Sequence, residues 1–208
     1  ASRAATDAER EVLKRYSGFG GLKFVLNNVD VDNIDNRDIE FWNKSDRKYY
    51  DQTKELFDTI REGASDDKEA KELTDSIKRS VNTAFYTPAP VIGAIAKVMK
   101  DAGVEVRSIL DPSAGIGKFG DAFKGEYPDV RVSAFEKDLL TGRILKALNP
   151  NDSVTIDGFE TIKPELKGTF DVATSNIPFG DIKVMDDEYR KSGNDAKRYA
   201  VSTIHNYY

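Results

Sequence analysis

Short apolar runs alternate with helical patterns through the second half of the chain, and this alternation constrains the fold more than any other feature. The apolar runs are Val106–Leu110, Val130–Phe135, Val154–Ile156 and Phe170–Thr174, and the helical patterns are Phe119–Lys124 and Leu139–Leu148. Strands joined by single helices form a parallel sheet with right-handed crossovers. The sequence therefore predicts an α/β fold with ligands at the carboxyl ends of the strands.

The first third of the chain has helical periodicity instead. Thr6 and Glu9 form a capping box before a first helix, and two further apolar faces follow at helical spacing. These faces are Ile39, Trp42, Tyr49, Leu56 and Ile60, then Ala70, Leu73, Ile77 and Val81. We expect a helical subdomain over residues 1–81, in which the aromatic side chains form the core, and an α/β domain over residues 82–208. That domain opens on a helix with Thr87 as N-cap and Val91, Ile95 and Met99 as its apolar face.

A glycine-rich loop follows the first predicted strand. Gly115, Gly117 and Gly120 form GxGxxG, and Glu136 ends the second strand, where a carboxylate can accept both hydroxyls of a ribose. This pattern fits a dinucleotide or S-adenosylmethionine. Asp111 stands before the glycines and favours S-adenosylmethionine, because its carboxylate suits a cationic amino group better than a pyrophosphate.

A second candidate site comes directly off the fourth predicted strand, at Asn176-Ile177-Pro178-Phe179. The Asn176 side chain and the Ile177 carbonyl can both accept hydrogen bonds from an exocyclic NH2 group. Pro178 stiffens the loop, and Phe179 offers a stacking face for a flipped base. The same residues also fit an ordinary turn after a strand, so this run alone leaves both interpretations open.

Taken together, these motifs resemble those of the adenine-N6 DNA methyltransferase family over roughly Thr83 to Tyr208. The resemblance implies a Rossmann-like S-adenosylmethionine-dependent methyltransferase fold, with a partial parallel sheet, that methylates adenine in DNA. It implies that four segments bind the cofactor. Phe85-Tyr86-Thr87-Pro88 closes over the methionine part, Asp111-Pro112-Ser113-Ala114-Gly115-Ile116-Gly117 is the glycine motif, Glu136 binds the ribose, and Asp157-Gly158-Phe159 contacts the adenine. The resemblance also implies that Asn176-Ile177-Pro178-Phe179 is the catalytic tetrapeptide.

One departure from the family pattern keeps alternatives open. Ile177 replaces the first proline of the tetrapeptide, although the family uses the backbone carbonyl of that residue, which isoleucine also has. The alternatives are an inactive cofactor- or DNA-binding module, N-methylation of a protein glutamine, and a nicotinamide-dependent oxidoreductase that rests on GxGxxG alone. The run Tyr16–Lys23 resembles a segment of very large methylase–helicase proteins from phages and conjugative elements, which implies a mobile-element origin.

Composition narrows the classes further. The chain has no cysteine and a single histidine, His205, so we expect no thiolate or histidine metal site. The net charge of −5 indicates that contacts with DNA are few, or that the main DNA-binding surface lies outside this chain. The absence of a long apolar run or a signal peptide predicts a cytoplasmic protein without a membrane partner. The incomplete sheet predicts a fragment of a larger polypeptide, or association with another copy.

Overall fold

The computed structural model describes residues 5–20, 22–26, 39–83, 86–177 and 187–202. The chain divides into two compact units: one contains Ala1–Tyr16 together with Tyr86–Tyr208, and the other contains Ser17–Phe85. This division differs from the expected boundary between residues 81 and 82, because the first helix, α1 (Asp7–Leu13), packs on a helix of the α/β unit. The α/β unit is therefore discontinuous in sequence.

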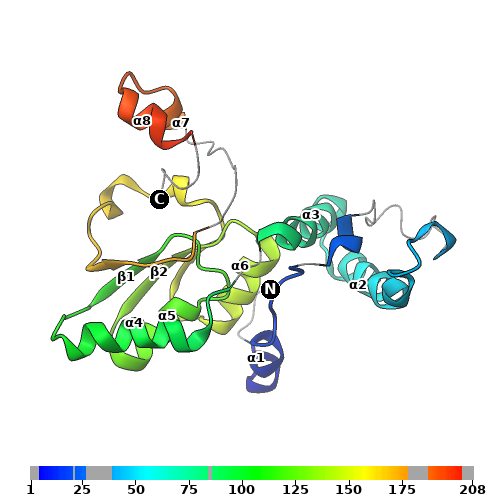
Figure 1. Ribbon diagram of the computed structural model, residues 1–208, viewed down its shortest axis with the longest axis horizontal. Coiled ribbons are helices and arrows are strands. Elements are labelled where there is room, and N and C mark those ends of the chain that lie inside the picture. Colours follow the sequence, from blue (N-terminus) through cyan, green and yellow to red (C-terminus); the bar gives the residue numbers. More distant parts are fainter. Residues whose placement is uncertain (1–4, 21, 27–38, 84–85, 178–186, 203–208) are drawn as a thin grey trace. The chain divides into compact units, whose positions relative to one another are not determined.

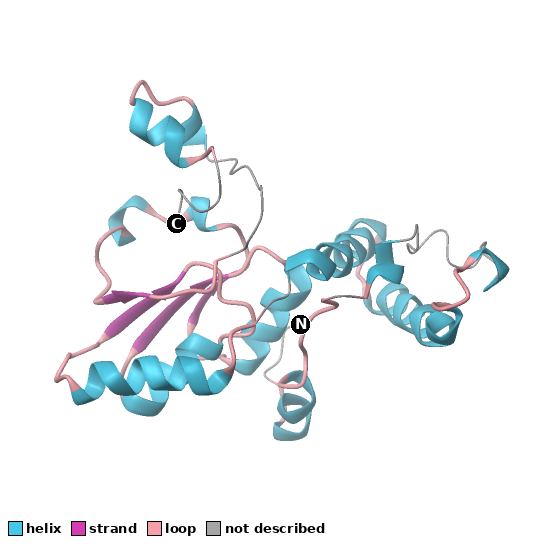
Figure 2. Ribbon diagram, in the orientation of Figure 1, coloured by secondary structure: helices cyan, strands magenta, loops and turns pink. Residues whose placement is uncertain are grey.

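The described part of the α/β unit contains a four-stranded parallel sheet (Figure 2). Its strands are β1 (Ser108–Asp111), β2 (Arg131–Phe135), β3 (Ser153–Thr155) and β4 (Val172–Ala173), in the order β3-β2-β1-β4. Each strand overlaps a predicted apolar run, so the predicted parallel sheet is confirmed. The chain leaves β1 toward β2 and β3 on one side and returns to β4 on the other. The strand order thus reverses between β1 and β4, where ligands bind in open α/β sheets.

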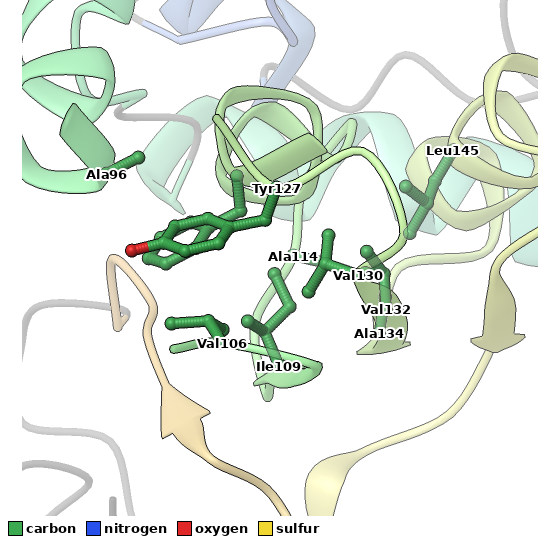
Figure 3. Packing of buried hydrophobic residues seen from close by; sticks show 10 residues of the cluster. Ala96, Val106, Ile109, Ala114, Tyr127, Val130, Val132, Ala134 and Leu145 are labelled. Atoms are coloured by element: carbon green, nitrogen blue, oxygen red, sulfur yellow. The ribbon is translucent and has the colours of Figure 1, made fainter. Parts of the chain in front are cut away.

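Three helices pack against one face of this sheet. They are α4 (Ala89–Asp101), α5 (Lys118–Glu126) and α6 (Leu139–Leu148), and α4 and α5 lie side by side (Figure 1). Figure 3 shows their shared core, in which Ala96, Tyr127 and Leu145 surround the strand residues Ile109 and Val132. The helices α5 and α6 cover their predicted ranges, so both predictions are confirmed.

The opposite face of the sheet has a smaller apolar cluster. Successive side chains of a strand point to opposite faces, so Leu110 of β1 lies here while Ile109 lies under the helices. Leu110 and Phe135 pack with Ile162, Phe159 and Phe170. These partners belong to the irregular connection between β3 and β4, which contains the short 3-10 helices η5 (Phe159–Thr161) and η6 (Pro164–Leu166).

Two predictions about α4 are wrong. Pro88, not Thr87, is the N-cap residue. The expected apolar face is turned outward at Val91 and Ile95, which are 51% and 42% exposed, while Ile92 and Ala96 are fully buried and only Met99 of the expected face packs on the core. The helix is apolar on both of these sides, so periodicity could not select the buried one. The small side chain of Ala96 lets α4 approach the core closely, which favours the observed face.

The second unit consists of helices and turns: η1 (Lys23–Leu26), η3 (Ile39–Phe41), η4 (Arg47–Tyr49), α2 (Tyr50–Gly63) and α3 (Asp67–Thr83). The predicted apolar face of α3 is confirmed, since Ala70, Leu73, Ile77 and Val81 are all buried. The buried ring of Trp42 contacts Phe24 and Tyr50, which confirms its predicted place in a core.

The predicted amphipathic segment that begins at Ile39 is wrong for its first half. The helix begins only at Tyr50, and Ile39 is 40% exposed. Residues 43–46 form turns instead, with Asp46 N–H donating to Asn43 O over 2.8 Å. This backbone turn interrupts the helical spacing before Tyr50.

Two short helices follow the candidate catalytic run, α7 (Asp187–Arg190) and α8 (Asp195–Ala200). Asn194 caps α8 by accepting a hydrogen bond from Ala196 N–H over 2.9 Å. Within the described residues, no helix combines the length and the hydropathy needed to span a membrane.

Candidate active site

The glycine loop and the candidate catalytic run meet at the point where the strand order reverses. Leu110 of β1 pairs with Ala173 of β4, and Thr174 N–H donates to Leu110 O over 2.9 Å. One residue further on, the Ser175 hydroxyl donates to Ser113 O over 3.3 Å. Asn176 therefore leaves the sheet directly beside the glycine loop.

The glycine loop itself is held by the neighbouring strand. Ala114 N–H donates to Phe135 O and Gly117 N–H donates to Ala114 O, each over 2.9 Å. Gly117 is the N-cap of α5 and has φ +90°, a left-handed conformation that favours glycine. A Cβ atom there would lie 2.7 Å from Leu145 Cδ1 and 2.8 Å from Asn149 Nδ2. The tight turn thus needs glycine at this position.

Tyr86 covers the loop from the other side. Its ring atom Cε1 lies 2.8 Å from where a Cβ on Gly115 would stand, and Gly115 has φ +56°. Lys118 Nζ lies 5.2 Å from the centroid of the same ring, within reach of a cation–π contact. Burial raises the pKa of the Tyr86 hydroxyl, and the neighbouring Tyr16 and Glu136 act in the same direction. The phenol is therefore neutral, and its ring lies closely over Gly115.

Asp111 ends β1 beneath this loop with only 1% of its surface exposed. Ser113 N–H donates to Oδ1 over 3.3 Å, while Oδ2 is buried without a hydrogen-bond partner among the described residues. Burial raises the pKa of Asp111 to about 6; the Ser175 hydroxyl and Ser113 N–H lower it only in part. A buried carboxylate oxygen without a partner is unfavourable, so a ligand with an ammonium group would fit here.

Glu136 follows β2 and its carboxylate is engaged on both oxygens. Oε2 accepts from Gly115 N–H and Oε1 accepts from Asp138 N–H, each over 2.8 Å. Burial raises the pKa of Glu136 to about 7, against the opposing effect of these two N–H groups. Each carboxylate oxygen can accept a second hydrogen bond. The pair of ribose hydroxyls expected from the sequence is thus compatible with the contacts that already exist.

The segment Asp157-Gly158-Phe159 follows β3, the strand next to β2. Glu136 N–H donates to Thr155 O over 3.0 Å, so this segment begins two residues beyond a direct contact with Glu136. Asp157 is exposed and its Oδ1 accepts from Gly158 N–H. The Phe159 ring is half-buried and meets Phe135 edge to face, with 5.6 Å between the ring centroids. Phe159 therefore belongs to the apolar cluster on the far face of the sheet.

The structure describes only some of the other predicted site residues. Asn176 and Ile177 are half-buried at the end of β4. Thr87 is half-buried and Pro88 is exposed at the start of α4. Phe85, Pro178 and Phe179 lie outside the described residues. Across the described ranges, no group of three or more His, Cys, Asp or Glu side chains could hold a metal ion.

Sequence reasoning missed a cluster of hydroxyl groups beside Glu136. Asp138 is the N-cap of α6 and accepts from both the N–H and the hydroxyl of Thr141, over 3.0 and 2.8 Å. The Tyr16 hydroxyl lies 3.4 Å from that of Thr141. An aspartate before an apolar run is a helix-start signal that would have found Asp138. Nothing local marks Tyr16, since its partner stands 125 residues further along the chain.

Comparison with known proteins found two partial similarities. Over 97 residues the chain is 35% identical to "Defense against restriction protein B" of Escherichia phage P1, a match that covers 46% of this chain and 4% of the phage protein. Over 64 residues it is 38% identical to "Type II methyltransferase M.XamI" of Xanthomonas campestris pv. amaranthicola, covering 31% of this chain and 12% of that protein. The chain thus spans a small part of either relative.

Neither a family model nor a solved structure matches the chain.

Proposed function

We propose that this chain is the S-adenosylmethionine-binding and catalytic module of an adenine-N6 DNA methyltransferase with a Rossmann-like fold. The observation that carries the proposal is the meeting of two motifs at the reversal of strand order, where Ser175 bonds to Ser113 and Asn176 emerges beside the glycine loop. Ligand binding at such a point is the rule for open α/β sheets. The partial match to a named methyltransferase supports the same chemistry.

The residues around the glycine loop fit the proposed cofactor. When bound, S-adenosylmethionine would supply a methyl group made electrophilic by its sulfonium. The unpartnered Oδ2 of Asp111 would accept from its ammonium group, Glu136 would accept from its ribose hydroxyls, and Asp157 would face its adenine. Tyr86, with Thr87 and Pro88 behind it, would close the methionine end against Ser113, Ala114, Gly115 and Gly117.

The chain's own contribution to methyl transfer would be to orient the target amino group. The lone pair of an exocyclic adenine nitrogen is delocalised into the ring, so the nitrogen is a poor nucleophile unless acceptors bind its hydrogens. Asn176 Oδ1 and Ile177 O would accept those hydrogens and direct the lone pair toward the methyl carbon. The N–C bond would form as the methyl–sulfur bond breaks, leaving a neutral thioether, and the nitrogen would release one proton to water. Phe179 would stack on the flipped base, and Pro178 would fix the loop. Positioning and exclusion of water would supply the rate, without a covalent enzyme intermediate.

DNA is the substrate that we propose, and the names of the two relatives are compatible with it. One of them is named for defence against restriction, and the other is a type II methyltransferase. The net charge of −5 implies that this chain alone grips DNA weakly, because phosphate neutralisation supplies much of the affinity. We therefore expect the base-recognition surface to come from a larger polypeptide or from a second copy of the chain.

A second candidate function is a binding module without turnover, which the isoleucine at position 177 favours. Proline at that position would restrict the loop that aims the carbonyl, and isoleucine leaves it less restricted. Such a module would bind the cofactor and transfer no methyl group.

Two measurements test the proposal. Calorimetry should show binding of S-adenosylmethionine and none of NAD; the reverse result would point to an oxidoreductase. Transfer of a tritiated methyl group to unmethylated DNA should then be detected, and Asn176→Ala should lower it about 100-fold, the cost typical of a lost transition-state hydrogen bond. If the chain binds the cofactor but transfers no tritiated methyl group to DNA, even when the rest of the larger polypeptide is present, the result would favour the binding module.

A further inference from the structure

The N-terminal helix lies against the glycine loop, although it is far from it in sequence. Leu13 and Tyr16 pack on a buried cluster formed by Ile116, Ile144 and Leu148. Ile116 stands between the two left-handed glycines of the loop, and the other two residues belong to α6. The segment before residue 17 therefore supports the loop from its outer side.

A row of polar contacts connects Tyr16 to Glu136. The Tyr16 hydroxyl lies 3.4 Å from the Thr141 hydroxyl, and the Thr141 hydroxyl donates to Asp138 Oδ1 over 2.8 Å. Asp138 N–H in turn donates to Glu136 Oε1 over 2.8 Å. Glu136 accepts from Gly115 N–H through its other oxygen. The row thus ends on the backbone of the glycine loop.

The same Thr141 hydroxyl also acts on Tyr86. Tyr16, Thr141, Glu136 and Asp138 are the polar groups whose interactions shift the pKa of the Tyr86 hydroxyl, in addition to its burial. The ring of Tyr86 closely approaches Gly115. Tyr86 therefore lies close to the hydroxyl cluster to which Tyr16, three residues after α1, contributes one member.

We propose that Tyr16 is a positioning residue of the cofactor site: by contacting the Thr141 hydroxyl, which bonds to Asp138, it keeps Asp138 and Glu136 in place against the glycine loop. The proposal rests on the proposed function, because the site it organises is that of S-adenosylmethionine. It adds a role for the N-terminal segment that none of the methyltransferase motifs contains.

The test uses Tyr16→Phe in the full chain, which removes the hydroxyl and keeps the ring packed on Ile116. We expect the Kd for S-adenosylmethionine to rise about three- to ten-fold, the range of one lost hydrogen bond, with the midpoint of thermal unfolding little changed. Tyr127→Phe is the matched control, since its hydroxyl donates to Val104 O over 2.9 Å away from the loop. It should leave the Kd unchanged.

A double-mutant cycle separates positioning from general loosening. If Tyr16 acts through Thr141, the combination of Tyr16→Phe with Thr141→Val should weaken binding no more than Thr141→Val alone. Additive effects of the two substitutions would overturn the proposal, as would a Tyr16→Phe variant with an unchanged Kd.

Hydrogen exchange of the unliganded chain distinguishes failure of this proposal from failure of the proposed function. Tyr16→Phe should speed exchange in residues 112–118 and 136–142, and Tyr127→Phe should not. If the wild-type chain binds no S-adenosylmethionine, the proposed function fails and exchange alone decides the role of Tyr16. Unchanged exchange in those segments would then overturn the role for Tyr16 as well.

Discussion

Asp111 is a carboxylate enclosed at the end of a central strand, with one oxygen that no described residue satisfies. Such a group is costly in the unliganded protein, because a buried charge loses its hydration. A cationic ligand would remove the cost by pairing with the ionised form. Asp111 would thus destabilise the unliganded protein and strengthen cofactor binding. Cofactor affinity should therefore depend on the protonation state of Asp111.

Cofactor affinity should therefore increase with pH. Burial raises the pKa of Asp111 to about 6 and that of Glu136 to about 7, and a ligand that binds their ionised forms must displace protons below those values. Calorimetry with S-adenosylmethionine should show tighter binding at about pH 7.5 than at about pH 5.5. Asp111→Asn should bind more weakly at both values and with a smaller change between them. Affinity that falls as pH rises would contradict this role.

The stability of the unliganded chain should change in the opposite sense. Because the folded-state pKa of Asp111 and of Glu136 is higher than the unfolded value, the folded state holds more protons between about pH 4 and pH 7. These two groups therefore make their largest contribution to the free energy of unfolding below that window, and this contribution is lost as pH rises through it. Urea unfolding should show a smaller decline for Asp111→Asn than for the wild type, and an identical decline would refute the assignment.

At the scale of elements, the turn from β1 into α5 depends on a glycine in a left-handed conformation. Gly117→Ala should destabilise the chain by roughly 1–3 kcal/mol, because the new Cβ would meet Leu145 and Asn149 at a strained φ. Gly93→Ala is a suitable control, since a Cβ at this position in α4 meets no atom within 4 Å. It should stabilise the chain by about 0.5–1 kcal/mol through its higher helix propensity. Urea midpoints of the two variants should move in opposite directions.

The strand β4 leads to Asn176 and is held to β1 by backbone pairing and by one aspartate just before the strand. Asp171 Oδ2 accepts from Arg107 N–H, Ser108 N–H and the Ser108 hydroxyl, over 2.9, 2.8 and 3.0 Å. The N–H of Arg107 and the hydroxyl of Ser108 are the main groups that lower the pKa of Asp171.

Asp171→Asn should lower the urea midpoint near neutral pH, since an amide oxygen is a weaker acceptor than a carboxylate. The stabilisation by Asp171 is present above its unfolded pKa and is lost as pH falls through the lowered folded value. The difference between the wild type and the variant should therefore shrink in acid. Asp129→Asn, at an exposed position outside the sheet, should leave the midpoint unchanged; an equal effect of both variants would contradict the special role of Asp171.

The accuracy of the sequence-based predictions differs between elements for a physical reason. The strands and α5 and α6 were predicted well because each is a single apolar run or stripe with polar residues at its ends. The helix α4 is apolar on two sides, so its buried face was decided by packing around Ala96 and not by periodicity. In the segment from Ile39 to Tyr49, the spacing of apolar residues predicts a helix, but a backbone turn interrupts it.

At the scale of the whole molecule, some features of the candidate site could likewise be predicted from the sequence and others could not. The acids and glycines at the strand ends were predictable, because a parallel sheet brings the carboxyl ends of its strands to one edge. The contacts of Tyr16 with Thr141 and of Tyr86 with Gly115 were not, since they join segments that no local pattern relates. The unpartnered oxygen of Asp111 depends on its surroundings in three dimensions, which the sequence does not encode at neighbouring positions.

The discontinuous α/β unit should survive removal of the segment between its two parts. Tyr16 and Tyr86 both approach the Thr141 hydroxyl, so the chain leaves this unit and returns to it at one place. A variant in which a short Gly-Ser linker replaces residues 17–84 should remain folded by circular dichroism and keep the affinity for S-adenosylmethionine. A variant that begins at Tyr86 lacks α1 and should melt at a lower temperature. Equal melting of the two variants would show that α1 contributes nothing.

The packing of α1 on α6 also has a consequence for biosynthesis. A ribosome releases α1 before its partners on α6, since Tyr16 and Thr141 are separated by 125 residues. A helix of seven residues is marginal in water by itself. We therefore expect α1 to gain its packing on α6 only after the intervening unit has been synthesised.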